Sequence, residues 1–174
     1  IFRMGILNFY FQSDVDFTDL FTRVIGTFTI GLFSAIINLI FTMGEEYGWR
    51  YFSQTRLQSL YGNRIGVLLT GLMWGLSHLP LYFFVFYSGI EGVYASIDIT
   101  VFCIAIGIVL GLIYMESRSV IMVTFIHLLH NMFMANATSA EYNQDFIFTK
   151  EFLLVSVITA ILVYTPFLLN KKYN

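Results

Sequence analysis

The stretch FTIGLFSAIINLIFTMGEEYGWR, residues 28–50, sets a long apolar run directly against two adjacent carboxylates, Glu45 and Glu46, with Arg50 one helical turn further on. A run of about twenty apolar residues is long enough to cross a bilayer as a helix. Ionisable side chains at the end of such a run are costly in lipid, and they usually face a cavity or a partner. The stretch therefore predicts a membrane helix that carries two carboxylates to the mouth of a cavity.

The composition of the whole chain agrees with this reading. Of its 174 residues 57% are hydrophobic and 11% are charged, whereas a soluble domain has about 45–50% apolar and about 25% charged residues. The net charge of −2 offers no basic face, so we expect no nucleic-acid partner. Cys103 is the only cysteine and lies in an apolar run, where it is interpreted as a small buried hydrophobe.

Five apolar runs have about the length of a membrane span: residues 23–43, 65–86, 97–116, 119–137 and 152–169. Strand alternation is absent from them, and lipid requires the backbone to satisfy its own hydrogen bonds, so all five are predicted to be helices. The fold class is then an all-α polytopic bundle, with residues 1–174 as one membrane domain. The chain opens at Ile1 without the features of a signal peptide, and we expect upstream helices to be missing from this sequence.

Basic residues indicate how the spans are oriented. Six of them follow the first, third or fifth span and fall on one side of the predicted bundle, namely Arg50, Arg56, Arg64, Arg118, Lys171 and Lys172, whereas Lys150 falls on the other side. The other side receives acidic segments that include Asp14, Asp16, Asp19, Glu91, Asp98, Glu141, Asp145 and Glu151. The positive-inside rule places the first side in the cytoplasm. We expect an integral protein of the cytoplasmic membrane, with the lipid bilayer as its surroundings.

Two connecting features shape the first two spans. Residues 47–60 contain no proline and mix aromatic with polar residues, which suits either a helix at the membrane interface or a continuation of the first span. Residues 61–63, Tyr-Gly-Asn, are interpreted as the turn that follows. Pro80 lies two residues after His78 and is predicted to kink or end the second helix beside it.

The costly polar residues of the spans are few: Glu45, Glu46, His78, His127, His130 and Asn131. A spacing of four lets Glu46 pair with Arg50, and it puts His127 and Asn131 on one helix face. Glu45 is left without a local partner. Because Glu45, His78, His127 and Asn131 come from three spans, we expect them to converge on one site, whereas His130 is interpreted as a helix-to-helix contact and Trp74 as packing.

This set of side chains suits hydrolysis. A carboxylate in a low-dielectric pocket is an effective general base, and an imidazole can share a water with it. Asn and a second His offer N–H donors for a tetrahedral oxyanion. The same residues leave a zinc site open, since one Glu and two His suit zinc, although the H-E-x-x-H signature of zinc proteases is absent.

Three short segments, EEYGWR at 45–50, WGLSH at 74–78 and HLLHN at 127–131, resemble the motifs of the CPBP family, the CAAX proteases and bacteriocin-processing enzymes also called Abi proteins. In these motifs a Glu pair has Arg four after its second member, an aromatic residue has His four later, and His has Asn four later. The resemblance covers about residues 23–137. The family more often has Phe at the position of Trp74, and this difference is interpreted as a conservative change.

The resemblance implies a metal-independent membrane endopeptidase without cofactors, with a catalytic cavity reached from the cytoplasmic side. By position, Glu45 and His78 would activate water and His127 and Asn131 would hold the oxyanion, while Glu46 with Arg50 would support the first carboxylate. Family members usually have about eight helices, so three would lie outside this chain. The substrate would be a membrane-associated peptide or a protein terminus in a bacterium.

Two other functions stay open at the level of sequence. A bacteriocin immunity or regulatory protein of the same family would bind a membrane partner without cleaving it. A small transporter would use the intramembrane Glu and His residues as a proton relay, but it predicts internal repeats with paired broken helices, and the sequence shows none.

Overall fold

The computed structural model describes residues 17–137 and 147–174, and within these ranges every regular element is a helix. The elements are α2 (Phe17–Glu46), η1 (Tyr47–Gln54), α3 (Thr55–Tyr61), α4 (Asn63–Leu81), η2 (Tyr82–Phe86), α5 (Gly89–Ser117), α6 (Val120–Ala137), α7 (Lys150–Tyr164), η3 (Thr165–Leu169) and η4 (Lys171–Tyr173). The predicted all-α class is confirmed, and each of the five apolar runs forms a helix. The predicted loop charges Asp14, Asp16, Glu141 and Asp145 lie outside the described residues.

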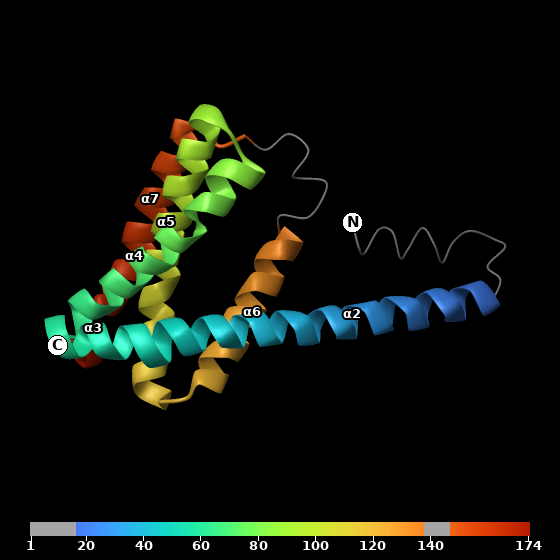
Figure 1. The fold of residues 1–174 in the computed structure, drawn as a ribbon, viewed down its shortest axis with the longest axis horizontal. Helices are drawn as coiled ribbons and strands as arrows, with labels where there is room; N and C mark the ends of the chain where they lie inside the picture. Colours follow the sequence, from blue (N-terminus) through green and yellow to red (C-terminus); the bar gives the residue numbers. More distant parts are fainter. Residues whose placement is uncertain (1–16, 138–146) are drawn as a thin grey trace.

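Four helical segments are long and apolar enough to cross a membrane: Val24–Tyr61, Asn63–Phe86, Gly89–Ser117 and Lys150–Leu169. The apolar part described for α6, Val120–Phe133, is shorter than these. Figure 1 shows α4, α5 and α7 running alongside one another, while the long α2 crosses them and extends beyond them. None of the residues in the most apolar window of this first segment is buried against the rest of the described chain.

Close packing of α4 on α5 depends on glycines. A Cβ atom added to Gly71 would lie 2.7 Å from the Cα of Ile104, and one added to Gly75 would lie 2.6 Å from the Cα of Thr100. Small residues four apart let two membrane helices approach closely, where van der Waals contact replaces the missing hydrophobic drive. Gly107, one helical turn before Gly111, faces Gly71 from α5. The two G-x-x-x-G segments therefore hold together the pair of helices that supports the site.

Gly75→Ala is expected to destabilise the protein by about 1–3 kcal/mol, because the added methyl group meets the backbone of Thr100 and the two helices must separate. Gly31→Ala is the matched control, since nothing lies within 4 Å of a Cβ atom there. Thermal unfolding in detergent micelles measures both variants. Equal melting temperatures for Gly75→Ala and the wild type would contradict this account of the α4–α5 contact.

The first span does not stop at the glutamate pair but continues to Tyr61. Residues 47–54 form a π-helix between α2 and α3, so the second of the two predicted forms, a continued span, is correct. Gly62 has a φ of 81° and separates α3 from α4, which confirms the turn at 61–63. Pro80 lies one residue before the end of α4, and the chain then winds as the π-helix η2.

The π-helix keeps one polar face of this long span directed inward. Thr42, Glu46, Arg50 and Gln54 recur at intervals of four, and they are the buried residues between 41 and 54. An interval of four exceeds the α-helical turn of about 3.6 residues but falls short of the wider π-helical turn. Residues four apart rotate slowly around an α-helix in one direction and around a π-helix in the other. The change from α to π at Tyr47 therefore offsets this rotation and keeps Gln54 on the same side as Thr42.

The basic residues are distributed differently from the prediction in one respect. Arg64 donates to the Leu168 carbonyl at 3.0 Å, and Lys172 pairs with Glu116 at 3.4 Å, so the start of α4 and the end of α5 meet the last helical turns of the chain. Arg50, predicted to be one of these loop charges, is instead fully buried beside Glu46. Its charge is neutralised inside the protein because a lone cation there would be strongly disfavoured.

The third helix starts earlier than predicted. Glu91 and Asp98, expected in a loop, both lie in α5, whose first residue is Gly89. Glu91 accepts a hydrogen bond from the Phe148 backbone N–H at 3.2 Å, which ties this end of α5 to the segment before α7. The helix is longer than the prediction because the prediction followed the continuous apolar run, which begins only near residue 97.

Tyr173 anchors the C-terminal segment inside the bundle. Its ring is buried, and its hydroxyl donates to the Ile108 carbonyl of α5. Burial raises the pKa of the Tyr173 phenol well above its ordinary value, so the ring docks in its neutral form. Gly111 packs against Val67, Gln54 and this hydroxyl, so the anchored segment contacts the same residue, Gln54, that continues the buried polar face.

Candidate active site

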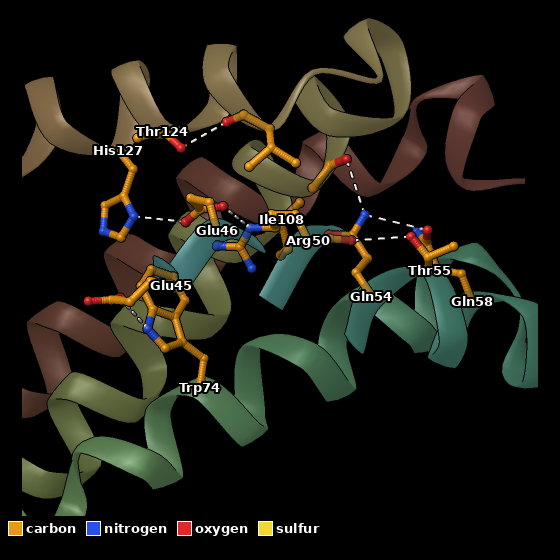
Figure 2. Close-up of polar contacts among 12 residues, drawn as sticks. Glu45, Glu46, Arg50, Gln54, Thr55, Gln58, Trp74, Ile108, Thr124 and His127 are labelled. Atoms are coloured by element: carbon orange, nitrogen blue, oxygen red, sulfur yellow. Dashed lines mark hydrogen bonds and ion pairs between the residues drawn. The ribbon is translucent and has the colours of Figure 1, made fainter. Parts of the chain in front are cut away.

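Glu46 is the centre of a buried ionic cluster that joins two helices. Its Oε1 lies 2.8 Å from Nδ1 of His127 on α6, and its Oε2 lies 2.9 Å from Nε of Arg50 on η1 (Figure 2). The second contact is an ion pair rather than an aligned hydrogen bond. Glu46 and Arg50 are both 0% exposed. The predicted pairing of Glu46 with Arg50 is confirmed, and both carboxylate oxygens of Glu46 are in use.

Glu45 is in a different position from its neighbour. It is half-buried, and its Oε2 accepts a hydrogen bond of 3.1 Å from the indole Nε1 of Trp74 on α4 (Figure 2). Within the described residues its second oxygen, Oε1, has no hydrogen-bond partner. Of the two adjacent glutamates, Glu45 is therefore the one with an oxygen free to meet a water or a substrate.

His78 is held by the main chain of its own helix. Its Nδ1 lies 2.9 Å from the Trp74 carbonyl oxygen, and because a carbonyl only accepts, Nδ1 must carry the hydrogen. In the neutral ring Nε2 then has the free lone pair that a general base requires. Among the described residues no hydrogen bond or ion pair joins His78 directly to Glu45, but Trp74 contacts both.

Trp74 lies in the middle of this group. The guanidinium carbon of Arg50 is 4.8 Å from the centroid of its ring, and the His127 ring packs edge-on against it with centroids 5.1 Å apart. The Trp74 side chain is buried. Glu45, Glu46, Arg50 and His127 are thus brought together around one indole, from the α2–η1 span, α4 and α6.

Asn131 and His130 lie on α6 about one turn beyond His127, but they are not part of these contacts. Asn131 is exposed and makes no hydrogen bond within the described residues. His130 stacks on Phe102 of α5 with ring centroids 5.3 Å apart. His130 therefore makes the helix-to-helix contact that the sequence predicted, although through ring stacking rather than a hydrogen bond.

The chain matches the Rce1-like family of type II CAAX prenyl endopeptidases over residues 17–133, which is more than half of its length. The chain belongs to this family. Neither a curated protein nor a solved structure matches it significantly. The family match confirms the resemblance inferred from the three motifs, and it extends over α2 and all the predicted site residues, from Glu45 to Asn131.

Membership in the Rce1-like family identifies the protein as a CAAX-type intramembrane endopeptidase, a hydrolase whose substrate is a peptide or protein at the membrane. The long apolar helices make it an integral membrane protein. Outside the ionic cluster, an apolar groove of about 500 Å³ is lined by residues of α4, η2 and α5 such as Pro80, Phe84 and Thr100. None of the predicted site residues lines this groove.

The described residues contain no group of three His, Cys, Asp or Glu side chains placed to hold a metal ion. In the Rce1-like chain Nδ1 of His127 makes a hydrogen bond to Glu46, which leaves Nε2 as the nitrogen of that ring without a partner. The zinc site that the sequence left open would require Glu45, His78 and His127 to bind one ion together. Oε2 of Glu45 and Nδ1 of His78 contact Trp74 and Nδ1 of His127 contacts Glu46, while the other polar atom of each side chain has no partner within the described residues.

Two site residues were not predicted from the sequence. Gln54 is 0% exposed, and its Nε2 donates to the Gly111 carbonyl at 3.2 Å, which fastens the π-helix to α5 next to Arg50. Trp74 was interpreted as packing, but it is also a hydrogen-bond donor to Glu45. The spacing of four from Glu46 through Arg50 could have indicated Gln54, whereas no sequence pattern indicated the direction of the indole N–H.

Proposed function

We propose that this protein hydrolyses a peptide bond of a membrane-associated peptide or protein by a water molecule that Glu45 and His78 activate, without a metal ion. Glu45 takes one proton from the water, and this proton is delivered to the nitrogen of the scissile bond, either directly from Glu45 or after transfer to Nε2 of His78. The hydroxide adds to the scissile carbonyl carbon, and the tetrahedral oxyanion collapses to release the amine.

A single observation carries this proposal: the two adjacent glutamates have different environments. Glu46 has both oxygens engaged and is fully buried, so it cannot reach a water. Glu45 keeps one free oxygen and partial exposure. General base catalysis requires a carboxylate within hydrogen-bond reach of the water whose proton it abstracts, and Glu45 alone of the pair meets that condition.

Stabilisation of the oxyanion falls to His127 and Asn131 in this proposal. Nδ1 of His127 faces Glu46, so Nε2 is the nitrogen that remains to contact the oxyanion. The amide of Asn131 is exposed one turn away on α6, and it would turn toward the oxyanion when substrate occupies the site. Arg50 supports the arrangement by holding Glu46.

The orientation of the protein is part of the same proposal. Arg118 and Lys172 line one polar groove near Asn63, and Arg64 binds the neighbouring C-terminal turns, so basic side chains gather at one end of the bundle. The positive-inside rule favours that end for the cytoplasm. We therefore propose that substrate enters from the cytoplasmic side. We also propose that the membrane is a bacterial cytoplasmic membrane.

The test is cleavage of a membrane-peptide library by the purified protein in detergent or liposomes, with and without a zinc chelator. The expected result is cleavage that the chelator leaves unchanged and that His78→Ala lowers by at least about 10²-fold, since it removes a proton-transfer group. Activity lost to the chelator would establish a metal enzyme. Cleavage equal in the wild type and His78→Ala would point to a contaminating peptidase, and the non-catalytic immunity function would then be preferred.

A further inference from the structure

Trp74 makes polar contacts with both members of the proposed water-activating pair. Its indole N–H donates to Glu45 Oε2 at 3.1 Å, and its main-chain carbonyl accepts from His78 Nδ1 at 2.9 Å. The first contact leaves Oε1 of Glu45 free, and the second leaves Nε2 of His78 free. One residue thus selects which oxygen and which nitrogen of the pair remain available.

The indole ring is itself held in place from several directions. Arg50 lies over the ring, the rings of His127 and His78 pack edge-on against it, and Trp74 belongs to the buried cluster that contains Leu110. A cation over an indole face and edge-on aromatic contacts are both favourable and directional. The N–H is consequently directed at Glu45 by packing that does not depend on the hydrogen bond.

The backbone position of Trp74 is equally constrained. Gly71 and Gly75 flank it on α4 and lie against the backbone of α5, so α4 can neither rotate nor withdraw without opening that contact. A catalytic group must be held within a fraction of an ångström by neighbours whose own conformations are locked by packing. The indole, fixed by both its ring contacts and its helix, meets that requirement.

We propose that Trp74 is a positioning residue that orients Glu45 and His78 for activation of water, rather than a packing residue alone. The inference rests on the proposed function of Glu45 and His78. Phenylalanine at this position would preserve ring contacts with Arg50 and His127, but it has no N–H to donate, so the Glu45 carboxylate would be free to rotate. The tryptophan is therefore not a conservative equivalent of phenylalanine in this chain.

The chain contains one other tryptophan, and it serves as the matched control. Trp49 lies on the π-helix η1 and packs against the same core cluster as Trp74. Within the described residues its indole N–H makes no hydrogen bond. Trp49→Phe therefore changes a comparable ring in the same part of the molecule without removing a hydrogen bond to Glu45.

The first arm of the experiment detects the hydrogen bond without any substrate. Protein labelled with 15N-tryptophan has two indole N–H signals in its NMR spectrum, and Trp49→Phe assigns them. Glu45→Ala is expected to shift the Trp74 signal and to speed its exchange with solvent, while the Trp49 signal stays in place. If Glu45→Ala leaves both signals unchanged, the contact is absent and the proposal is overturned, whatever the protein hydrolyses.

The second arm measures kcat and KM on the peptide identified for the wild type. Trp74→Phe, and replacement of Trp74 by the isosteric analogue benzothienylalanine, which lacks the N–H, are expected to lower kcat about tenfold or more with little change in KM. Trp49→Phe is expected to retain wild-type kcat. The analogue preserves the ring volume, so it separates positioning from packing if Trp74→Phe folds poorly.

The outcomes of the two arms distinguish this inference from the function on which it rests. Wild-type kcat in the benzothienylalanine protein would overturn the positioning role and return Trp74 to packing, even with the hydrogen bond present and the peptidase active. A wild-type protein that cleaves nothing would remove both the proposed function and the positioning role, while the first arm would still establish the indole contact with Glu45.

Discussion

Glu45→Gln is expected to lower kcat for peptide hydrolysis by about 10²–10⁴-fold, with a much smaller change in KM. The substituted amide keeps the size of the side chain and still offers an oxygen to the Trp74 N–H, but it cannot accept a proton from water. The loss should therefore fall on the chemical step rather than on the fold. Initial rates over a range of substrate concentrations separate the two constants.

A control for this substitution is Glu151→Gln. The Glu151 side chain is 70% exposed near the start of α7, where it is paired only loosely with Lys150 at 3.7 Å, and its replacement should leave kcat unchanged. Hydrolysis by Glu45→Gln at the wild-type rate would mean that Glu45 is not the general base. Equal losses of kcat in both variants would mean that removal of any carboxylate lowers the activity, whatever its position.

Glu46→Ala is expected to destabilise the folded protein by about 3–5 kcal/mol, a larger effect than that of any exposed substitution. Arg50 would then be left 0% exposed with its counterion removed, and His127 would lose the acceptor for its Nδ1. Removing one partner of a buried ion pair destabilises a protein much more than removing both partners, because the remaining charge is buried without a counterion. Thermal or denaturant unfolding in detergent micelles measures the change.

The physical reason is tested by removing both charges together. A double variant, Glu46→Leu with Arg50→Met, leaves no unpaired ion and is expected to recover much of the stability lost in Glu46→Ala, although not the activity. Lys150→Ala with Glu151→Ala is the matched exposed pair and should change stability by less than about 1 kcal/mol. If the double variant at 46 and 50 were as unstable as Glu46→Ala, the buried charge on Arg50 would not be the cause.

Several features of the fold follow directly from local sequence. Apolar runs near twenty residues long form helices because lipid leaves the backbone no other way to satisfy its hydrogen bonds. The pairing of Glu46 with Arg50 follows from their spacing of four within one span. The turn at Gly62 and the end of α4 after Pro80 depend on properties of those single residues.

Other features depend on contacts between helices, which spacing along one helix does not specify. Glu45 and Glu46 are adjacent and chemically identical, so their different roles depend on the directions in which α6 and α4 approach the span. His127 on α6 binds Glu46, whereas Trp74 on α4 binds Glu45. Helix propensity and periodicity contain no information about these long-range partners.

The sequence by itself determined that this protein is a helical membrane protein of a peptidase family, because hydropathy over twenty residues and three motifs are local properties. Only the tertiary structure decided that Glu46 is enclosed in an ionic cluster while Glu45 retains a free oxygen beside the Trp74 indole. The physical reason is that burial and hydrogen-bond partners are properties of packed helices. Two neighbouring carboxylates acquire different chemistry only when different helices cover them.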